Sequence, residues 1–153
     1  MRTVEWIPEA DWKKIVEHVP IVSVDLVVLG ENNEILLGRR ENEPARGEWF
    51  VPGGRVWKGE TLEDAVHRVA ADELGVDVEI VERLGAYEHF YDTADIPNVG
   101  GKQYIAHGFV VRPDSTDFAT DDQHSAMKLF STPPSDLHEY PAAYLADSEI
   151  FEL

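Results

Sequence analysis

The chain has 153 residues, which is enough for one domain with a substantial hydrophobic core. Its 30 acidic residues outnumber 13 basic ones, and the net charge of -17 argues against nucleic acids and anionic membranes as partners, because both bind basic surfaces. Since the chain has no cysteine, disulfides and thiolate metal sites are excluded.

No run of roughly 18 apolar residues predicts a membrane helix, and the first residues do not resemble a signal peptide. We therefore expect a soluble cytoplasmic protein. The acidic residues are spread along the whole chain. Two interpretations compete: an ordinary acidic protein, or a halophilic protein adapted to a high-salt cytosol, where screening weakens self-repulsion. We favour the second as a hypothesis.

The first half of the chain predicts a helix and then strands. Apolar residues at helical spacing predict a helix over residues 8–19, and a β-branched run predicts a strand over residues 21–29. A turn at residues 31–34 is expected to lead into the return strand of a hairpin, which begins at residues 35–37. A loop over residues 42–48 then precedes a short apolar stretch.

The stretch from residue 53 to residue 76 organises the rest of the chain. We predict a tight glycine loop and then an amphipathic helix, with Thr61 as its N-cap and Gly75 just past its end. Several polar residues lie in this loop and on this helix: Arg55, Glu60, Arg68, Asp72 and Glu73.

The second half predicts strands, loops and a final helix. Residues 78–91 read as extended chain with a bulge at Gly85, followed by a polar loop over residues 92–101. The remaining expected elements are strands at 104–111 and 127–130, a polar loop at 113–124 and a helix at 135–146. Strands and helices in this order predict a mixed α/β domain.

Five of the 13 basic residues lie close together in sequence: Arg39, Arg40, Arg46, Arg55 and Lys58. In so acidic a chain, such a cluster beside a glycine loop favours a phosphate-bearing ligand. The alternative is that these residues only pair with neighbouring acids, namely Glu41, Glu43, Glu48 and Glu60.

The spacing around the predicted helix resembles the Nudix box, Gly-x5-Glu-x7-Arg-Glu-U-x-Glu-Glu-x-Gly-U, in which U is a bulky apolar residue. The residues on the pattern are Gly54, Glu60, Arg68, Glu73, Gly75 and Val76. This resemblance implies a single Nudix domain over residues 1–153, with a mixed β-sheet sandwiched between α-helices. Three residues depart from the pattern, since Val69 and Asp72 replace glutamates and Ala70 replaces the bulky apolar residue.

The departures bear on metal binding and on the catalytic base. Position 69 is a valine, so only Glu73 and the shorter Asp72 remain as carboxylates on this face of the helix. We expect the site to hold fewer metal ions than a full Nudix helix, or to hold them more weakly. Either the protein is catalytically dead or its base comes from elsewhere. Histidine has a suitable pKa, and His89 and His124 both flank polar loops, but the residues alone do not decide between them. Glu60 and Arg68 are better interpreted as a salt bridge that secures the loop on the helix.

Five short strings resemble one branch of the Nudix proteins, the GDP-mannose mannosyl hydrolases. They are PIVSVD at 20–25, LGRR at 37–40, WFVPGGRV at 49–56, HFYD at 89–92 and DQH at 122–124. That branch also lacks the glutamates at positions 69 and 72. The resemblance implies Mg²⁺-dependent cleavage, with Mn²⁺ as an alternative metal, of the bond between sugar C1 and oxygen. The products would be GDP and a free sugar of inverted configuration.

Carried over residue by residue, the resemblance assigns roles to individual side chains. The metal ligands would be the Gly53 carbonyl, Glu73 and Gln123, and His124 would deprotonate the attacking water. Arg55 and Arg40 would neutralise the leaving diphosphate. The remaining substrate contacts would come from Asp25, His89 and Tyr104, together with Arg40. The family forms dimers, so the N-terminal segment, residues 1–19, could lie at a homodimer interface.

Two alternatives remain at this point. One is a conventional Nudix pyrophosphohydrolase, which attacks phosphorus in another nucleoside diphosphate derivative and in which Asp72 supports a fuller metal site. The other is a non-catalytic nucleotide-sugar-binding module. The sequence does not identify the hexose, and it does not assign the recognition of guanine.

Overall fold

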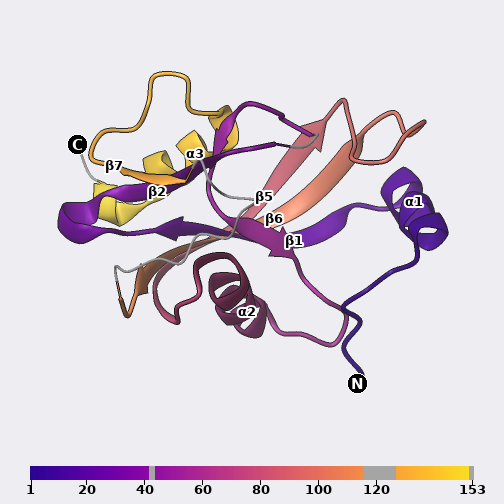
Figure 1. The fold of residues 1–153 in the computed structure, drawn as a ribbon, viewed down its shortest axis with the longest axis horizontal. Helices are drawn as coiled ribbons and strands as arrows, with labels where there is room; N and C mark the ends of the chain where they lie inside the picture. The colour runs from indigo at the N-terminus through magenta and orange to yellow at the C-terminus, as the bar shows by residue number, and fades with distance from the viewer. Residues whose placement is uncertain (42–43, 116–126, 152–153) are drawn as a thin grey trace.

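The computed structural model describes residues 1–41, 44–115 and 127–151, which contain three α-helices and seven strands (Figure 1). The helices are α1 (Glu9–His18), α2 (Leu62–Leu74) and α3 (Glu139–Asp147). The strands are β1 (Ile21–Val28), β2 (Ile35–Arg39), β3 (Trp49–Phe50), β4 (Gly53–Arg55), β5 (Val78–Tyr91), β6 (Lys102–Pro113) and β7 (Lys128–Phe130). Two short 3₁₀ helices are η1 (Glu31–Asn33) and η3 (Glu149–Phe151).

The described strands form two sheets. The larger sheet has the order β4-β1-β6-β5, in which β1 is parallel to β6 and the other two pairings are antiparallel. The smaller sheet has the order β3-β2-β7 and is antiparallel throughout. The fold is therefore the predicted mixed sheet with helices on both sides.

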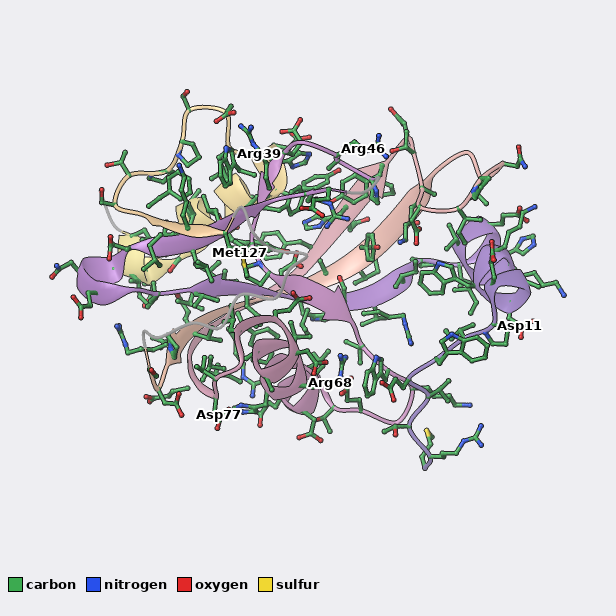
Figure 2. All side chains as sticks on the ribbon, viewed as in Figure 1. Asp11, Arg39, Arg46, Arg68, Asp77 and Met127 are labelled. Atoms are coloured by element: carbon green, nitrogen blue, oxygen red, sulfur yellow. The ribbon has the colours of Figure 1, made fainter. Side chains whose placement is uncertain are left out.

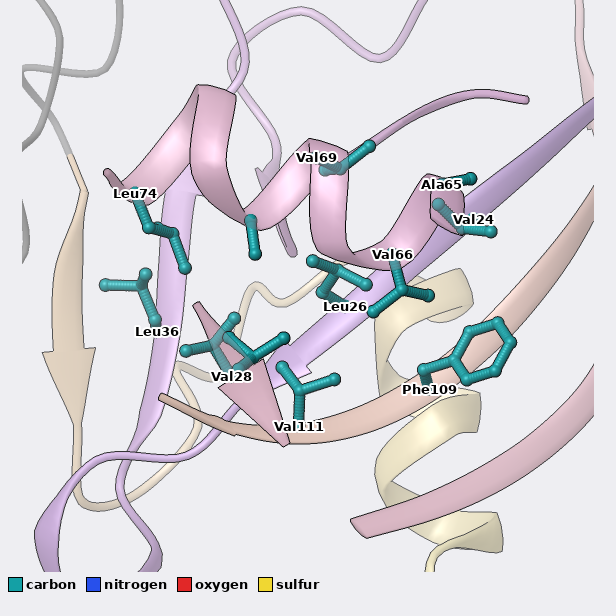
Figure 3. Packing of buried hydrophobic residues seen from close by; sticks show 12 residues of the cluster. Val24, Leu26, Val28, Leu36, Ala65, Val66, Val69, Leu74, Phe109 and Val111 are labelled. Carbon is teal, nitrogen blue, oxygen red and sulfur yellow. The ribbon is translucent and has the colours of Figure 1, made fainter. Parts of the chain in front are cut away.

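Helix α2 covers one face of the larger sheet. The Thr61 side chain accepts a hydrogen bond from the Asp64 amide at 3.1 Å, and Gly75 ends the helix in the left-handed region with φ 71°, so both predicted caps are confirmed. The apolar face of α2 packs on alternate residues of β1 and on β6 (Figure 3). The main members of this cluster are Val24, Leu26, Val28, Val66, Val69, Leu74 and Val111.

Helix α3 packs on the opposite face of β1. Val27 and Leu29 point away from α2 because side chains alternate along a strand, and they cluster with Tyr144 of α3. Asp25 and Ser23 lie on this same face, and they are the two polar residues of an otherwise apolar strand. The packing of β1 on both faces thus holds Asp25, which is half-buried, on the side of α3.

Helix α1 lies beside the loop between β5 and β6. Val16 and Ile21 cluster with Ile96 of that loop, and the buried Lys102 ammonium pairs with Asp95 at 2.9 Å. Trp6 precedes α1 and is 75% exposed. Whether this segment forms a homodimer interface stays a prediction. Across the described residues, no helix is both long and apolar enough to cross a membrane.

Several local predictions were wrong. Residues 35–37 do not form a hairpin with β1: β2 pairs with β3 and β7 in the smaller sheet, and only an isolated bridge joins Leu29 to Ile35. The expected glycine loop at residues 53–55 is the strand β4, which pairs with β1. Helix α3 begins at Glu139, later than predicted, with His138 as its N-cap. The predicted loop at 113–124 lies largely outside the described residues.

Candidate active site

Two adjoining cavities open between the larger sheet and the smaller one. The first, of about 220 Å³, brings together side chains from five strands and a loop. Its lining residues include Ser23, Asp25, Arg40, Phe50, Gly53, Arg55, His89, Tyr91 and Tyr104. Every residue for which a substrate contact was predicted therefore lines one cavity, although these residues are far apart in the sequence.

The second cavity has a volume of about 390 Å³ and lies toward α2. Glu73 and Met127 line it, and it shares Arg40 and Gly53 with the first cavity. Met127 lies near the middle of the molecule in Figure 2. The predicted ligand Gln123 and the predicted base His124 lie outside the described residues. A ligand that extended through both cavities would pass Arg40 at their junction.

Asp25 lines the first cavity and has close neighbours at both carboxylate oxygens. The Tyr144 hydroxyl donates a hydrogen bond to its Oδ2 at 2.6 Å, and its Oδ1 would lie only 2.3 Å from a Cβ atom at position 53. Glycine at 53 is therefore required by the approach of this carboxylate. Burial raises the pKa of Asp25 to about 6, although the Tyr144 hydrogen bond and the Arg40 charge both act to lower it.

His89 is a buried imidazole with an unsatisfied nitrogen. Its ring stacks on Tyr140 at 4.0 Å between centroids, and its Nε2 has no hydrogen-bond partner among the described residues. Burial, with a smaller effect from His138, lowers the pKa of His89 to about 4, so the ring is neutral near pH 7. Because buried polar groups are nearly always hydrogen-bonded, this nitrogen is a ready donor or acceptor for a ligand in the cavity.

The two predicted arginines are held in different ways. Arg40 Nε donates to the Pro44 carbonyl at 2.7 Å, and its guanidinium lies 5.5 Å from the Phe50 ring. Arg55 Nη2 donates to the Glu5 carbonyl at 2.9 Å, so this guanidinium is tied to the N-terminal segment.

The N-terminal contact of Arg55 was not foreseen from the sequence. Arg55 lies between the first cavity and an apolar groove of about 930 Å³, which Trp6, Trp12 and Trp57 also line. The residues before α1 therefore reach the edge of the candidate site.

The interpretation of Glu60 and Arg68 as a structural pair is confirmed. Arg68 Nε lies 2.6 Å from Glu60 Oε2, and both side chains are largely buried. Arg68 also donates to the Arg55 carbonyl at 2.8 Å, while Glu60 accepts from the Trp57 amide. The pair therefore ties the loop between β4 and α2 to the helix.

The helix itself offers few metal ligands. Val69 is 2% exposed and packs in the core, with its Cγ2 3.1 Å from the position of a Cβ on Gly54. The Asp72 side chain is largely exposed, and its Oδ2 lies 3.7 Å from Arg68 Nη1. Within residues 1–41, 44–115 and 127–151, no group of three or more His, Cys, Asp or Glu side chains gathers to hold a metal.

A divalent cation nevertheless fits the oxygen donors that line the second cavity. Glu73 supplies a carboxylate there and Gly53 a main-chain carbonyl, and hard cations such as Mg²⁺ prefer such ligands. With one helix carboxylate at the cavity, the site suits few ions.

Helix α3 contributes side chains that the sequence did not single out. Tyr144 contacts Asp25, and Tyr140 stacks on His89. The only available signal was two tyrosines four residues apart in the predicted final helix, which is also an ordinary pattern for core residues.

Comparison with known proteins identifies the class of protein. The sequence profile of the NUDIX domain matches residues 19–152, and the chain therefore belongs to the Nudix hydrolase family. The fold agrees with this, since the structure of a MutT NUDIX hydrolase from Burkholderia pseudomallei superposes with a TM-score of 0.69. That superposition covers 84% of this chain and 97% of the other, at 26% identity.

Two named proteins from archaea are similar to this chain in sequence. The chain is 55% identical over 139 residues to the low-salt glycan biosynthesis protein Agl8 of Haloferax volcanii. The aligned region covers 91% of this chain and 88% of that protein. The chain is 39% identical over 82 residues to the ADP-ribose pyrophosphatase of Methanocaldococcus jannaschii, over 53% of this chain and 48% of that protein.

Proposed function

We propose that this Nudix protein hydrolyses GDP-mannose or a related GDP-hexose at sugar C1 and releases GDP and the free sugar. The observation that carries this proposal is the convergence of Asp25, Arg40, His89 and Tyr104 on one cavity, next to the cavity of Glu73. These residues come from the strings that resemble the GDP-mannose mannosyl hydrolases. The name of the relative Agl8 refers to glycan biosynthesis, which is consistent with a nucleotide-sugar substrate.

The burial of Val69 favours attack at carbon over attack at phosphorus. Attack at phosphorus in a Nudix enzyme uses metal ions and carboxylates on this helix, and here the position of the first helix glutamate is in the core. Attack at C1 makes a smaller demand on the metal, because the cation then needs only to stabilise the leaving diphosphate. The neutral His89 and the half-buried Asp25 are suited to hydrogen-bond sugar hydroxyls.

The proposed reaction divides the work between the two cavities. Water attacks C1, the C1–O bond breaks with its electron pair passing to the diphosphate, and His124 accepts the proton from water. Arg40, at the junction of the cavities, is placed to stabilise the negative charge on the leaving group. A Mg²⁺ ion on Glu73, Gly53 and Gln123 would supply further charge stabilisation to the same diphosphate.

Product analysis in ¹⁸O-labelled water tests the proposal directly. We expect GDP and a hexose that carries the label at C1, with turnover that is lost in EDTA and restored by Mg²⁺. GMP and sugar 1-phosphate, with the label on phosphate, would instead support the conventional pyrophosphohydrolase. That alternative has its own support in the similarity to an ADP-ribose pyrophosphatase. Binding of GDP-hexoses without any turnover would support the binding module.

His124→Gln tests the assignment of the base. General-base catalysis contributes typically 10²–10⁴-fold, so we expect kcat to fall by about that factor while the Kd for GDP-mannose changes little. His18→Gln, on the exposed end of α1, is a matched control that should retain full turnover. Full activity in His124→Gln would remove this residue from the role.

A further inference from the structure

Helix α3 presents two tyrosines, one turn apart, to the back of the proposed sugar-binding residues. Tyr144 hydrogen-bonds Asp25, and Tyr140 stacks on His89. Residues four apart share a helix face, so one rigid element contacts both residues. We propose that Tyr144 and Tyr140 are positioning residues that fix the Asp25 carboxylate and the His89 imidazole for substrate. This inference rests on the proposed function.

The contact of Tyr144 with Asp25 is built into the sheet beneath it. The Tyr144 side chain is fully buried, and its ring lies over Gly108, where a Cβ atom would be 2.7 Å from its Cε1. Gly108 is the register partner of Asp25 in the pairing of β6 with β1. The absence of a side chain at 108 therefore makes the space through which the tyrosine hydroxyl reaches the carboxylate.

The hydrogen bond leaves the two oxygens of Asp25 in different surroundings. Oδ2 accepts from Tyr144 at 2.6 Å, whereas Oδ1 lies beside Gly53, in the cavity wall. Without the tyrosine hydroxyl, the carboxylate could rotate about χ2, which is a broad torsion. Tyr144 therefore determines which way Oδ1 points.

Tyr140 fixes the imidazole in a second way. Its ring is nearly parallel to His89, with an interplanar angle of 5°, and its hydroxyl bonds both the amide and the carbonyl of Phe90. The amide donates to the hydroxyl at 2.9 Å, and the hydroxyl donates to the carbonyl at 2.8 Å. The stacked ring thus sets the plane of His89 and the direction of its unsatisfied Nε2.

Helix α3 also makes hydrogen bonds with β5 away from Asp25 and His89. Tyr87 donates to Asp147 at 2.7 Å, and Ser148 donates to Glu82 at 2.6 Å. The Tyr87 ring also packs against Tyr144 at 4.6 Å between centroids, while its hydroxyl bonds Asp147, which does not line the first cavity. Tyr87→Phe is therefore a matched control: it removes one hydroxyl and one hydrogen bond to a carboxylate outside the site.

The test is a double-mutant cycle on turnover of GDP-mannose by the full chain with Mg²⁺. A displacement of about 1 Å in a positioned group can reduce rate 10²-fold, so Tyr144→Phe should lower kcat/KM by roughly 10- to 100-fold. Tyr87→Phe should change it by less than about twofold. In the Asp25→Asn background, Tyr144→Phe should have little further effect, because residues that act as one unit are not additive.

A second cycle pairs Tyr140→Leu with His89→Gln. Circular dichroism shows whether Tyr144→Phe folds, and the second cycle tests the proposal if it does not. The inference is supported if the two substitutions are non-additive in every cycle whose variants fold. Effects that add in both cycles, or a Tyr144→Phe loss no larger than that of Tyr87→Phe, overturn it while wild-type turnover upholds the proposed function. A wild-type chain that hydrolyses no GDP-hexose contradicts the proposed function, and the inference fails with it.

Discussion

The side chain at position 69 decides how this helix can take part in chemistry. Val69 is buried among core residues of β1 and α2, next to Gly54 of the box. A carboxylate at this position would have to leave the core to reach a cation, or stay buried at a high energetic cost. The surrounding core therefore requires an apolar residue at position 69, where the Nudix pattern has a glutamate.

Val69→Glu should consequently destabilise the protein and should not create a better metal site. Burying a carboxylate without a partner costs enough that we expect the free energy of unfolding to fall by about 2–4 kcal/mol. Urea unfolding in metal-free buffer measures this fall. Ala71→Glu, at an exposed position of the same helix, is the control and should change stability by about 0.5 kcal/mol or less. A variant as stable as wild type would mean that position 69 can face the cavity.

Some residues of the candidate site could be predicted from the sequence, whereas others could not, because their contacts form only in the folded chain. Asp25 and His89 lie in short strings with family likeness, and Asp25 also stands out as an acid in an apolar strand. Tyr144 hydrogen-bonds a residue 119 positions away, and only the tertiary fold creates that contact. The same holds for the hydrogen bonds of Arg55 with Val4 and Glu5, which are 51 and 50 positions away in the sequence. Many helices and strands can be inferred from local patterns, but the long-range contacts that support a site cannot.

At the level of elements, α2 and the preceding loop behave as one unit. Glu60 accepts hydrogen bonds from the Trp57 amide and from Arg68, whose guanidinium also lies 3.7 Å from the Trp57 ring centroid. Burial alone would raise the pKa of Glu60, but these hydrogen bonds and the Arg68 charge outweigh it, and the pKa is lowered from 4.5. The pair therefore fixes the strand that carries Gly53 and Arg55 relative to the helix that carries Glu73.

Glu60→Gln should be strongly destabilising, because it leaves a buried arginine without its carboxylate. We expect the free energy of unfolding to fall by about 3–5 kcal/mol near pH 7. Since the pKa of Glu60 is lower in the folded chain, the wild-type advantage is complete above the unfolded value of 4.5 and shrinks as the pH falls below it. Denaturant unfolding between pH 3 and pH 7 would follow this convergence.

The exposed pair of Glu63 and Arg83 provides the control for that measurement. Both side chains are more than half exposed, so Glu63→Gln should cost about 1 kcal/mol or less. Equal effects of the two substitutions would show that the buried pair has no special role in holding the loop.

Strand pairing was the least predictable feature at this scale. The turn at η1 was expected to close a hairpin, yet β1 pairs with β4 and β6, while β2 enters the smaller sheet. The strands that pair with β1 come later in the chain, and a local turn signal carries no information about such partners. The capped helix α2, by contrast, is determined by its own residues and was predicted to within a residue at both ends.

For the whole molecule, the dominant feature is the excess of negative charge. The net charge is -17, and Figure 2 shows side chains that end in oxygen around the outline of the ribbon. Some exposed acids pair with a basic residue, as Glu17, Asp136 and Glu63 do. Repulsion among such charges favours the expanded chain, and salt reduces it because the Debye length falls from about 10 Å at 0.1 M to about 3 Å at 1 M. The ion pairs at buried positions, such as Glu60 with Arg68, are screened much less.

Stability should therefore rise with KCl concentration. Thermal unfolding from roughly 0.1 M to 3 M KCl should show a continuous increase in Tm, steepest where the Debye length falls most. A variant with the exposed acids Glu79, Glu88 and Asp114 replaced by their amides should be more stable than wild type at low salt and gain less from added KCl, since it has less repulsion to screen. A Tm that is flat or falls with KCl would contradict adaptation to high salt and leave the acidity without a role in stability. Parallel salt dependences in the two proteins would place the effect of KCl elsewhere than in surface repulsion.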